Sequence, residues 1–160
     1  SVYGASKLEG EIQALQYNVD SIVIRTSWVY SEYGNNFVKT MLKLMKEKES
    51  INVVNDQVGA PTYAFDLGSI ILSIISSGKW VPGIFHFTNN GKISWYEFAL
   101  AIKEIAGSTC KLNPIPTAQY PTLAKRPSYS ILDTQKIKSV YQIETKNWKE
   151  SLAACLKNLA

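Results

Sequence analysis

The sequence contains no glycine-rich turn of the kind that holds a dinucleotide. None of its nine glycines falls in a G-x-G-x-x-G or G-x-x-G-x-x-G arrangement after an expected strand. Such a turn lets backbone N–H groups at a helix N-terminus cradle a pyrophosphate. We therefore expect no complete dinucleotide site within these 160 residues.

Long apolar runs are missing as well. The most apolar stretch, residues 67–75, is far shorter than the roughly 20 residues of a membrane span, and it has helical periodicity instead. The N-terminus shows no basic region followed by an apolar core and a cleavage site. These absences predict a protein without a membrane partner, and we expect a cytoplasmic location.

Cysteine and histidine are scarce. Cys110 and Cys155 are the only cysteines, and they lack the paired spacing of a zinc or redox motif, so we expect two free thiols. The single histidine, His86, lies within an expected strand, without a Cys, Asp, Glu or second His close by in the sequence. This setting favours a hydrogen-bonded structural histidine over a ligand or a catalytic base.

The basic excess is modest. Seventeen Lys and Arg against thirteen Asp and Glu give a net charge of +4, and the lysines are spread over several expected helices. Nucleic-acid binders concentrate basic residues on one surface and often interleave stacking aromatics. We therefore expect no nucleic-acid partner, whereas a small anionic ligand suits this charge.

Strand-like and helix-like segments alternate along the whole chain, which indicates an α/β fold. Residues 21–30 are predicted to form one buried parallel strand, and ligands bind beyond the carboxyl ends of such strands. That rule puts Thr26, Ser27, Trp28 and Tyr30 beside a ligand, although Trp28 is equally compatible with a core position.

Five helical segments are expected, and the last three of them have a structural interpretation only. In residues 2–15, Leu8, Ile12 and Leu15 should face inward. Further helices are expected after Asn35 or Asn36 as N-cap, from a cap at Asp66 to Gly78, from the Ser94–Glu97 capping box to Gly107, and over residues 147–159. The apolar stripe of the 66–78 helix should be buried, with Leu67, Ile70, Ile71, Ile74 and Ile75.

The chemical signal lies on the first helix. Tyr3 and Lys7 are four residues apart, so their side chains should share a helix face. A neighbouring ammonium favours the ionised form of a phenol, and such a tyrosine can exchange a proton with a carbonyl or alcohol oxygen while hydride moves at the adjacent carbon. The same spacing also occurs by chance on many helices.

Three loops are candidates for binding. Asn35 and Asn36 precede a helix that needs one cap, which leaves the other amide for a ligand. Residues 55–61, which include Gln57, are rich in turn formers. Residues 112–127 are expected to be irregular, and Lys125 and Arg126 at their end could bind an anion, since a guanidinium grips a diphosphate with two hydrogen bonds.

Seven motifs, in this order, resemble the extended short-chain dehydrogenase/reductases and most closely their dTDP-4-dehydrorhamnose reductase branch. They are Tyr3-Gly-Ala-Ser-Lys7 with the following Leu-Glu-Gly-Glu, Arg25-Thr-Ser-Trp-Val-Tyr30, Gly34-Asn-Asn-Phe-Val38, Asp56-Gln-Val-Gly-Ala-Pro-Thr62, Phe85-His-Phe-Thr-Asn89, Gly91-Lys-Ile-Ser-Trp-Tyr-Glu-Phe-Ala99 and Ala124-Lys-Arg-Pro-Ser-Tyr-Ser-Ile-Leu-Asp133. The resemblance covers nearly the whole chain.

The resemblance implies a fold and a reaction. The fold would be the C-terminal part of a Rossmann-like NAD(P)-binding domain, residues 1–33, followed by a smaller α/β substrate-binding domain, mainly residues 34–160, with some segments returning to the Rossmann sheet. The reaction would be the reduction of the 4-keto group of dTDP-6-deoxy-L-lyxo-4-hexulose by NADPH or NADH, giving dTDP-L-rhamnose for polysaccharide. Use of a magnesium ion stays open.

The resemblance also implies roles for single residues. Tyr3 would protonate the forming oxyanion, and Lys7 would tune Tyr3 and bind the nicotinamide ribose, with Ser27 beside the cofactor. Trp28 would stack on the deoxysugar. Asn35 or Asn36, Gln57 and Arg126 would line the nucleotide-sugar pocket, with Arg126 on the diphosphate.

Some alternatives remain open from sequence. The first is another extended family member, a nucleotide-sugar epimerase or dehydratase. The second is a non-catalytic relative such as the regulatory subunit of methionine adenosyltransferase. We also expect the chain to be a fragment whose glycine motif and third catalytic hydroxyl lie upstream, to be inactive alone, and to expose apolar surface that a homodimer could cover.

Overall fold

The computed structural model describes residues 1–122 and 126–159. Their regular elements, in chain order, are α1 (Val2–Tyr17), β1 (Ile22–Arg25), β2 (Val29–Tyr30), α2 (Phe37–Glu47), β3 (Ser50–Val54), β4 (Val58–Gly59), β5 (Thr62–Tyr63), α3 (Ala64–Ser76), β6 (Gly83–His86), β7 (Ile93–Ser94), α4 (Trp95–Ile105), β8 (Lys111–Ile115), the 3-10 helix η1 (Thr117–Gln119), α5 (Gln135–Tyr141) and α6 (Trp148–Leu159). The expected α/β class is confirmed.

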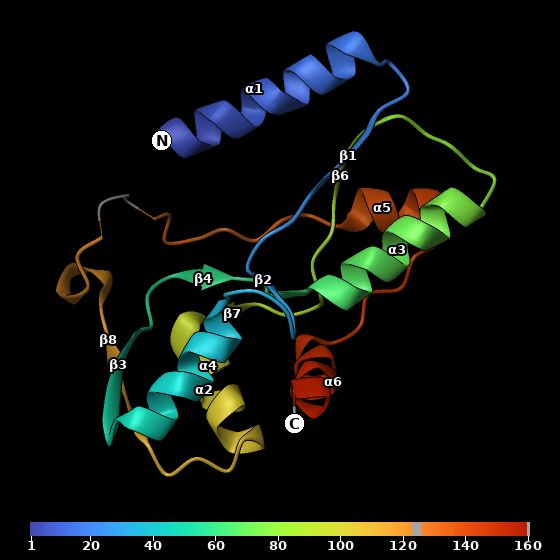
Figure 1. The fold of residues 1–160 in the computed structure, drawn as a ribbon. Helices are drawn as coiled ribbons and strands as arrows, with labels where there is room; N and C mark the ends of the chain where they lie inside the picture. Colours follow the sequence, from blue (N-terminus) through green and yellow to red (C-terminus); the bar gives the residue numbers. More distant parts are fainter. Residues whose placement is uncertain (123–125, 160) are drawn as a thin grey trace.

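Within the described part of the chain, each strand pairs with one other strand to form a two-stranded sheet. Pairs β1–β6, β2–β5 and β3–β8 are parallel, and β4–β7 is antiparallel. In the first pair Ile22 lies opposite Gly83 and Arg25 opposite His86. Figure 1 shows β1 running from the end of α1 toward β2, with β6 beside it. The loop after β1 therefore lies near the middle of the molecule.

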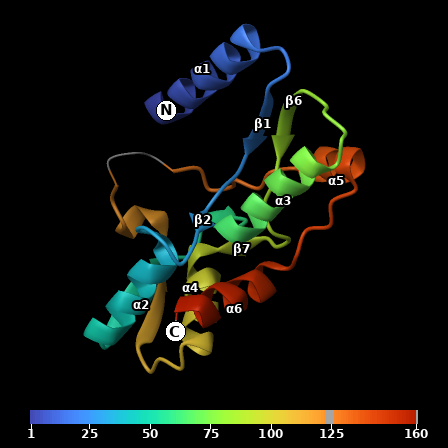
Figure 2. The same ribbon diagram turned by 45° about the vertical axis from the view of Figure 1, so that its right-hand side comes forward.

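Two apolar clusters form the core. The larger one gathers α2, α4, α6, β3 and β8 around fully buried residues such as Val38, Phe98, Ile102 and Leu152. The smaller one joins α3, β6 and α5 through Ile74, Phe85, Phe87, Ile137 and Ile143. In Figures 1 and 2, α1 lies at one edge of the molecule, away from α2, β3 and β8.

Two of the expected helix caps are confirmed. The Asn36 side chain accepts a hydrogen bond from the Lys39 N–H at the start of α2, and Ser94 forms a complete capping box with Glu97 at the start of α4. Cys110 and Cys155 are free, buried thiols. The Nδ1 atom of His86 lies 3.0 Å from the Asp133 carbonyl oxygen, consistent with a structural histidine.

The prediction of a single strand over residues 21–30 is wrong. The chain forms β1 and then β2, separated by residues 26–28, because Trp28 adopts a left-handed backbone with φ of 48°. A strand cannot continue through that conformation. Residues 112–127 are also less irregular than expected, since β8 pairs with β3 and η1 follows it.

Three further expectations about helices are wrong. Asp66 is not the cap of α3, which begins after Tyr63; it lies in the first turn with a buried side chain. Only Ile74 of the expected α3 stripe is buried. Leu8 and Ile12 of α1 are 50% and 47% exposed, because no described element covers their face. Exposed apolar side chains therefore gather on α1, as the fragment interpretation expected, and also on α3, where burial was expected.

No helix in the described ranges, 1–122 and 126–159, is both long and apolar enough to cross a membrane.

Candidate functional site

Two neighbouring cavities contain most of the candidate residues. The α1 cavity, of about 1010 Å³, is lined by α1, β1 and the segment 127–132. Its walls include Tyr3, Lys7, Glu11, Arg25, Ser27, Pro127 and Tyr129. The α2 cavity, of about 390 Å³, is lined by α2, β3 and nearby loops, including Phe37, Met41, Leu44, Gln57, Trp95, Tyr120 and Arg126. Arg126 and Pro127 are consecutive but line different cavities, so the two spaces adjoin.

Tyr3 and Lys7 share one face of α1, as expected. The Lys7 Nζ atom lies 5.6 Å from the centroid of the Tyr3 ring. Both side chains line the α1 cavity, and Tyr3 is 72% exposed there. The Tyr3 hydroxyl can donate and accept hydrogen bonds and the Lys7 ammonium can donate them, so both groups are available to a ligand in this cavity.

An ion pair joins α1 to the end of β1. Arg25 donates through Nε to Glu11 Oε1 at 2.8 Å and through Nη2 to Glu11 Oε2 at 2.6 Å. These hydrogen bonds from Arg25 lower the pKa of Glu11, although partial desolvation opposes them. The carboxylate on this wall of the α1 cavity is therefore stably ionised.

Side-chain hydrogen bonds hold the chain just after β1. The Thr26 hydroxyl donates to Thr62 Oγ1 at 2.9 Å, and the Ser27 hydroxyl donates to the Ala60 carbonyl at 2.8 Å. The Thr62 N–H donates back to the Trp28 carbonyl at 3.2 Å. The loop that carries Ser27 and Trp28 is thus fixed against the residues before β5.

Trp28 lies in a tight aromatic site. Its ring stacks on the Trp95 ring, with centroids 3.6 Å apart and an interplanar angle of 12°. The ring centroids of Trp95 and Phe37 are 4.6 Å apart. A Cβ atom at Gly59 would lie only 2.5 Å from the Trp28 indole, so the close approach requires glycine. Trp28 follows Ser27 of the α1 cavity and stacks on Trp95 of the α2 cavity, so it lies between the two spaces.

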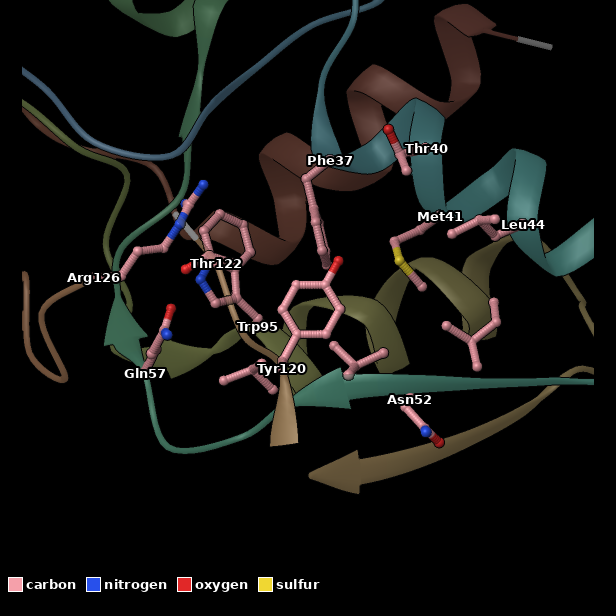
Figure 3. Close-up of a pocket in the computed structure, with 13 residues that line it drawn as sticks. Phe37, Thr40, Met41, Leu44, Asn52, Gln57, Trp95, Tyr120, Thr122 and Arg126 are labelled. Atoms are coloured by element: carbon pink, nitrogen blue, oxygen red, sulfur yellow. The ribbon is translucent and has the colours of Figure 1, made fainter. Parts of the chain in front are cut away.

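The α2 cavity has a polar end and an apolar end. Figure 3 shows Arg126 and Gln57 at one end, Trp95 and Tyr120 in the middle, and Met41 and Leu44 at the other. The guanidinium is the positive group of the polar end. Such a cavity suits an elongated ligand with an anionic group near Arg126 and an apolar ring deeper inside.

Hydrogen bonds place Gln57 in this cavity. The Asp56 carboxylate accepts from the Thr117 N–H at 2.9 Å and from the Thr117 hydroxyl at 2.6 Å, and these bonds lower the pKa of Asp56. Gln57 Nε2 donates to the same Thr117 oxygen at 3.0 Å. The turn after β3 is therefore tied to η1, with Gln57 buried between them.

The segment that carries Arg126 is tied to β4. The Val58 N–H donates to the Ser128 carbonyl at 2.8 Å, and the Ser130 N–H donates to the Val58 carbonyl at 2.9 Å. Lys125, the other basic residue expected to bind an anion, lies outside the described residues. The cation of this site that the structure describes is Arg126.

The two asparagines line neither cavity. Asn36 caps α2, and its Nδ2 group donates to the Ser31 carbonyl at 2.8 Å, so its amide is used within the loop. The Asn35 side chain is exposed at the same turn. The structure therefore brings together Tyr3, Lys7 and Ser27 in one cavity and Gln57 and Arg126 in the other. Asn35, Asn36 and Trp28 line neither cavity, although Trp28 stacks on the lining residue Trp95.

Sequence reasoning missed Trp95, Phe37 and Tyr120. The helix that begins at Trp95 was expected to be structural only, which is wrong because Trp95 forms a wall of the α2 cavity and stacks on Trp28. No local signal marked Trp95, because its place in the site depends on its stack with Trp28 from a distant part of the chain.

No group of three or more His, Cys, Asp or Glu side chains within residues 1–122 and 126–159 is arranged to hold a metal ion.

Comparison with known proteins identifies the family. The model of the RmlD substrate binding domain matches residues 1–160. The chain belongs to the RmlD substrate-binding domain family. It is also 46% identical to the dTDP-4-dehydrorhamnose reductase of Aggregatibacter actinomycetemcomitans, over 94% of this chain and 55% of that protein. The chain thus spans about half the length of the relatives it matches.

Solved structures agree with this membership of the RmlD family. A dTDP-4-dehydrorhamnose reductase from Clostridium acetobutylicum superposes with a TM-score of 0.94 at 41% identity, covering 99% of this chain and 56% of that one. The Bacillus anthracis dTDP-4-dehydrorhamnose reductase in complex with NADP superposes with a TM-score of 0.93 at 38% identity, covering 100% of this chain and 56% of that one. The Bacillus cereus UDP-glucuronic acid 4-epimerase, at 18% identity and a TM-score of 0.78, shares the Rossmann-like fold.

Proposed function

We propose that this chain is the substrate-binding part, with the catalytic Tyr–Lys pair, of an NAD(P)H-dependent dTDP-4-dehydrorhamnose reductase. The observation that carries the proposal is the pair of adjoining cavities, one with Tyr3 and Lys7 and the other with Arg126 and Gln57. The reaction is the reduction of the 4-keto group of dTDP-6-deoxy-L-lyxo-4-hexulose to the 4-hydroxyl of dTDP-L-rhamnose. Three relatives that are 46%, 43% and 34% identical to this chain carry this reductase name.

The dTDP-sugar lies across both cavities in this proposal. Arg126 binds the diphosphate, Gln57 adds a polar contact, and the apolar end at Met41 and Leu44 receives the thymine ring beyond Trp95. Trp28, between the two spaces, packs against the deoxysugar. This order directs the 4-keto carbon toward Tyr3 in the α1 cavity.

Residues of the α1 cavity fit a nicotinamide cofactor. The Lys7 ammonium offers three donors and the Tyr3 hydroxyl both donates and accepts, which suits the ribose hydroxyls of such a cofactor. Ser27 lines the same wall, although its hydroxyl donates to the Ala60 carbonyl. NADPH or NADH supplies the hydride when bound. Tyr3 then delivers the proton to the 4-oxygen, and Lys7 stabilises the tyrosinate that remains.

The domain assignment is part of the same proposal. Residues 1–33 belong to the dinucleotide-binding domain and residues 34–160 mainly to the substrate domain. The order of β1 and β6 in one parallel pair supports a return of residues 83–86 to the first domain. Location in the cytoplasm, a homodimer, inactivity of the isolated chain and any magnesium requirement remain predictions from sequence.

The alternatives differ from the reductase in their products. An epimerase or dehydratase would not give net oxidation of NADPH, and a non-catalytic relative would show no turnover at all. Epimerase and dehydratase structures match this chain at only 18% and 19% identity, which supports a shared fold alone. The higher identity to reductases favours the reductase function.

The test uses the full-length gene product with the 4-keto sugar nucleotide and follows NADPH oxidation. Tyr3→Phe should lower kcat by at least about 100-fold, because general acid catalysis contributes about 10²–10⁴-fold. Tyr17→Phe is the matched control, since Tyr17 is 84% exposed at the other end of α1 and lines neither cavity. Absence of turnover in the unmodified protein, or full activity of Tyr3→Phe, refutes the proposal.

A further inference from the structure

The hydroxyl of Thr117, the first residue of η1, lies between the side chains of Asp56 and Gln57. Its Oγ1 atom is 2.6 Å from Asp56 Oδ1 and 3.0 Å from Gln57 Nε2. The same carboxylate accepts the Thr117 N–H, at 2.9 Å to Oδ1 and 3.0 Å to Oδ2. These bonds lower the pKa of Asp56, so the carboxylate is ionised at neutral pH and accepts only.

The single proton of the Thr117 hydroxyl decides how the Gln57 amide is oriented. Because that proton is donated to the carboxylate of Asp56, the Thr117 oxygen can only accept a hydrogen bond from Gln57. The amide nitrogen must therefore face Thr117, since the reverse orientation would place two acceptors against each other. The Gln57 Oε1 atom is thereby directed away from Thr117.

The Gln57 Oε1 atom is an unpaired acceptor at the polar end of the α2 cavity. Gln57 lines this cavity and is only 7% exposed. Figure 3 shows its amide oxygen on the side of Arg126, and within residues 1–122 and 126–159 this oxygen accepts no hydrogen bond. A buried carbonyl without a donor is unfavourable, so a ligand that supplies a donor is favoured there. Residues of this chain alone bury Gln57 to this extent, so the additional part of longer relatives can add little around it.

Arg126 and Gln57 thus offer opposite hydrogen-bonding groups at one end of the α2 cavity. The guanidinium of Arg126 only donates, which suits the oxygens of a diphosphate. The Gln57 Oε1 atom only accepts, so it cannot bind those oxygens and requires an O–H or N–H group. In a dTDP-sugar, the donors next to the diphosphate are hydroxyls: the 3′-hydroxyl of the deoxyribose on one side and the hydroxyls of the sugar on the other.

We propose that Gln57 is a specificity-determining acceptor for a hydroxyl of the ligand, and that Asp56 and Thr117 hold its amide in the required orientation. The identity of the ligand as a sugar nucleotide rests on the proposed reductase function. Asp56 and Thr117 do not line the α2 cavity, so they are positioning residues that act through Gln57. A ligand without the hydroxyl leaves the buried Oε1 atom unpaired, and the site therefore binds it less tightly.

The experiment titrates the full-length gene product in a calorimeter with three ligands: dTDP, its analogue without the 3′-hydroxyl, and dTDP-L-rhamnose. If Gln57 accepts the 3′-hydroxyl, the unmodified protein binds dTDP about 3- to 10-fold more tightly than the analogue. Gln57→Leu then binds these two ligands within about twofold of each other. If Gln57 accepts a sugar hydroxyl instead, Gln57→Leu weakens binding of dTDP-L-rhamnose about 3- to 10-fold more than binding of dTDP.

Variants of Thr117 test the orientation of the amide. Thr117→Val removes the hydroxyl at nearly constant volume, so the Gln57 amide is free to turn and the selectivity should be lost as in Gln57→Leu. Thr117→Ser keeps the hydroxyl and should keep the selectivity. Thr109→Val is the matched control, since Thr109 is exposed and lines neither cavity. A purely structural role of Thr117 would weaken binding of all three ligands equally and leave the ratios of their Kd values unchanged.

The ratios of the Kd values decide the proposal. Ratios that are the same in Gln57→Leu, Thr117→Val and the unmodified protein overturn it. Selectivity that is lost in Gln57→Leu but kept in Thr117→Val also overturns it, because Thr117 then does not orient the amide. NADPH oxidation with the 4-keto sugar nucleotide separates this result from the proposed function. Unchanged ratios with normal turnover reject the hydroxyl acceptor alone, and selective binding of dTDP without turnover rejects the reductase function alone.

Discussion

Trp28 and Gly59 depend on each other. Trp28 has a left-handed backbone, which an L-residue adopts at a cost of about 1–2 kcal/mol, and its indole fills the space beside the Gly59 backbone. The stack on Trp95 and the hydrogen bonds of Thr26 and Ser27 offset that cost. The aromatic wall between the two cavities therefore depends on residue 59 being glycine.

Gly59→Ala should disturb this wall. The new methyl group would lie about where the indole is, so the ring must move and its stack on Trp95 must loosen, with a loss of about 1–3 kcal/mol in the free energy of unfolding. Denaturant unfolding measures the loss, and near-ultraviolet circular dichroism reports the tryptophan pair. Gly68→Ala, in α3 with open space at its Cβ position, is the control and should stabilise by up to about 1 kcal/mol. Unchanged stability and dichroism in Gly59→Ala would contradict the packing.

Arg126→Ala tests the polar end of the α2 cavity. Hydrogen bonds to a charged group contribute about 1.5–3 kcal/mol, so affinity for dTDP should fall about 10- to 100-fold. Calorimetric titration gives the Kd. Lys46→Ala removes one positive charge from the exposed face of α2, outside both cavities, and should change the Kd little. Equal affinity in Arg126→Ala would remove the residue from the nucleotide site.

At the scale of elements, a buried carboxylate joins three parts of the fold. Asp66 in α3 is 5% exposed and accepts hydrogen bonds from Asn89 Nδ2 at 2.8 Å, Ser151 Oγ of α6 at 2.5 Å and Lys146 Nζ at 3.0 Å. Burial raises the pKa of Asp66, but the hydrogen bonds from Ser151, Lys146 and Asn89 outweigh it and bring the pKa below its usual range. The network holds α3 against α6.

This network predicts an acid-sensitive stability. Because the folded pKa of Asp66 lies below the unfolded value of about 3.9, its contribution is present above that pH and is lost as the pH falls through the folded value. The free energy of unfolding of Asp66→Asn should be about 1–3 kcal/mol lower than that of the unmodified protein at pH 7. Below about pH 4 it should fall less steeply than that of the unmodified protein. Urea unfolding between pH 7 and pH 2 measures both. Asp20→Asn, at an exposed turn, is the control; an acid slope in Asp66→Asn equal to that of the unmodified protein would exclude the carboxylate as its source.

Local signals in the sequence predicted local structure well. Asn36 and Ser94 cap helices as expected, because capping depends on residues only three positions away. The apolar faces of α1 and α3 were predicted to be buried, but periodicity indicates a face and says nothing of what covers it. The same limit applies to the site: the motifs identified Tyr3, Lys7 and Arg126, whereas Trp95 joined it only through contacts between distant segments.

The whole molecule divides into well-packed and weakly attached parts. The larger cluster surrounds α4, which buries four residues, Phe98, Ala99, Ala101 and Ile102. The smaller cluster holds α3, β6 and α5 together. In contrast, α1 belongs to neither cluster, although it carries the proposed catalytic pair. The reactive residues thus lie on the element with the least support from the described chain.

This division predicts how amide protection is distributed in the 160-residue chain. Local opening is easiest where few apolar contacts are broken, so amides in Val2–Tyr17 should exchange at least about 100-fold faster than those in Trp95–Ile105. Hydrogen exchange followed by mass spectrometry resolves the two helices, with α2, which also packs into the larger cluster, as a second slow reference. The relatives are nearly twice as long, and an additional part packed on Leu8 and Ile12 should slow exchange in α1 while leaving α4 as it is. Equal protection of α1 and α4 in the 160-residue chain would mean that the Glu11–Arg25 pair and the exposed apolar face hold the helix far more strongly than their contacts indicate.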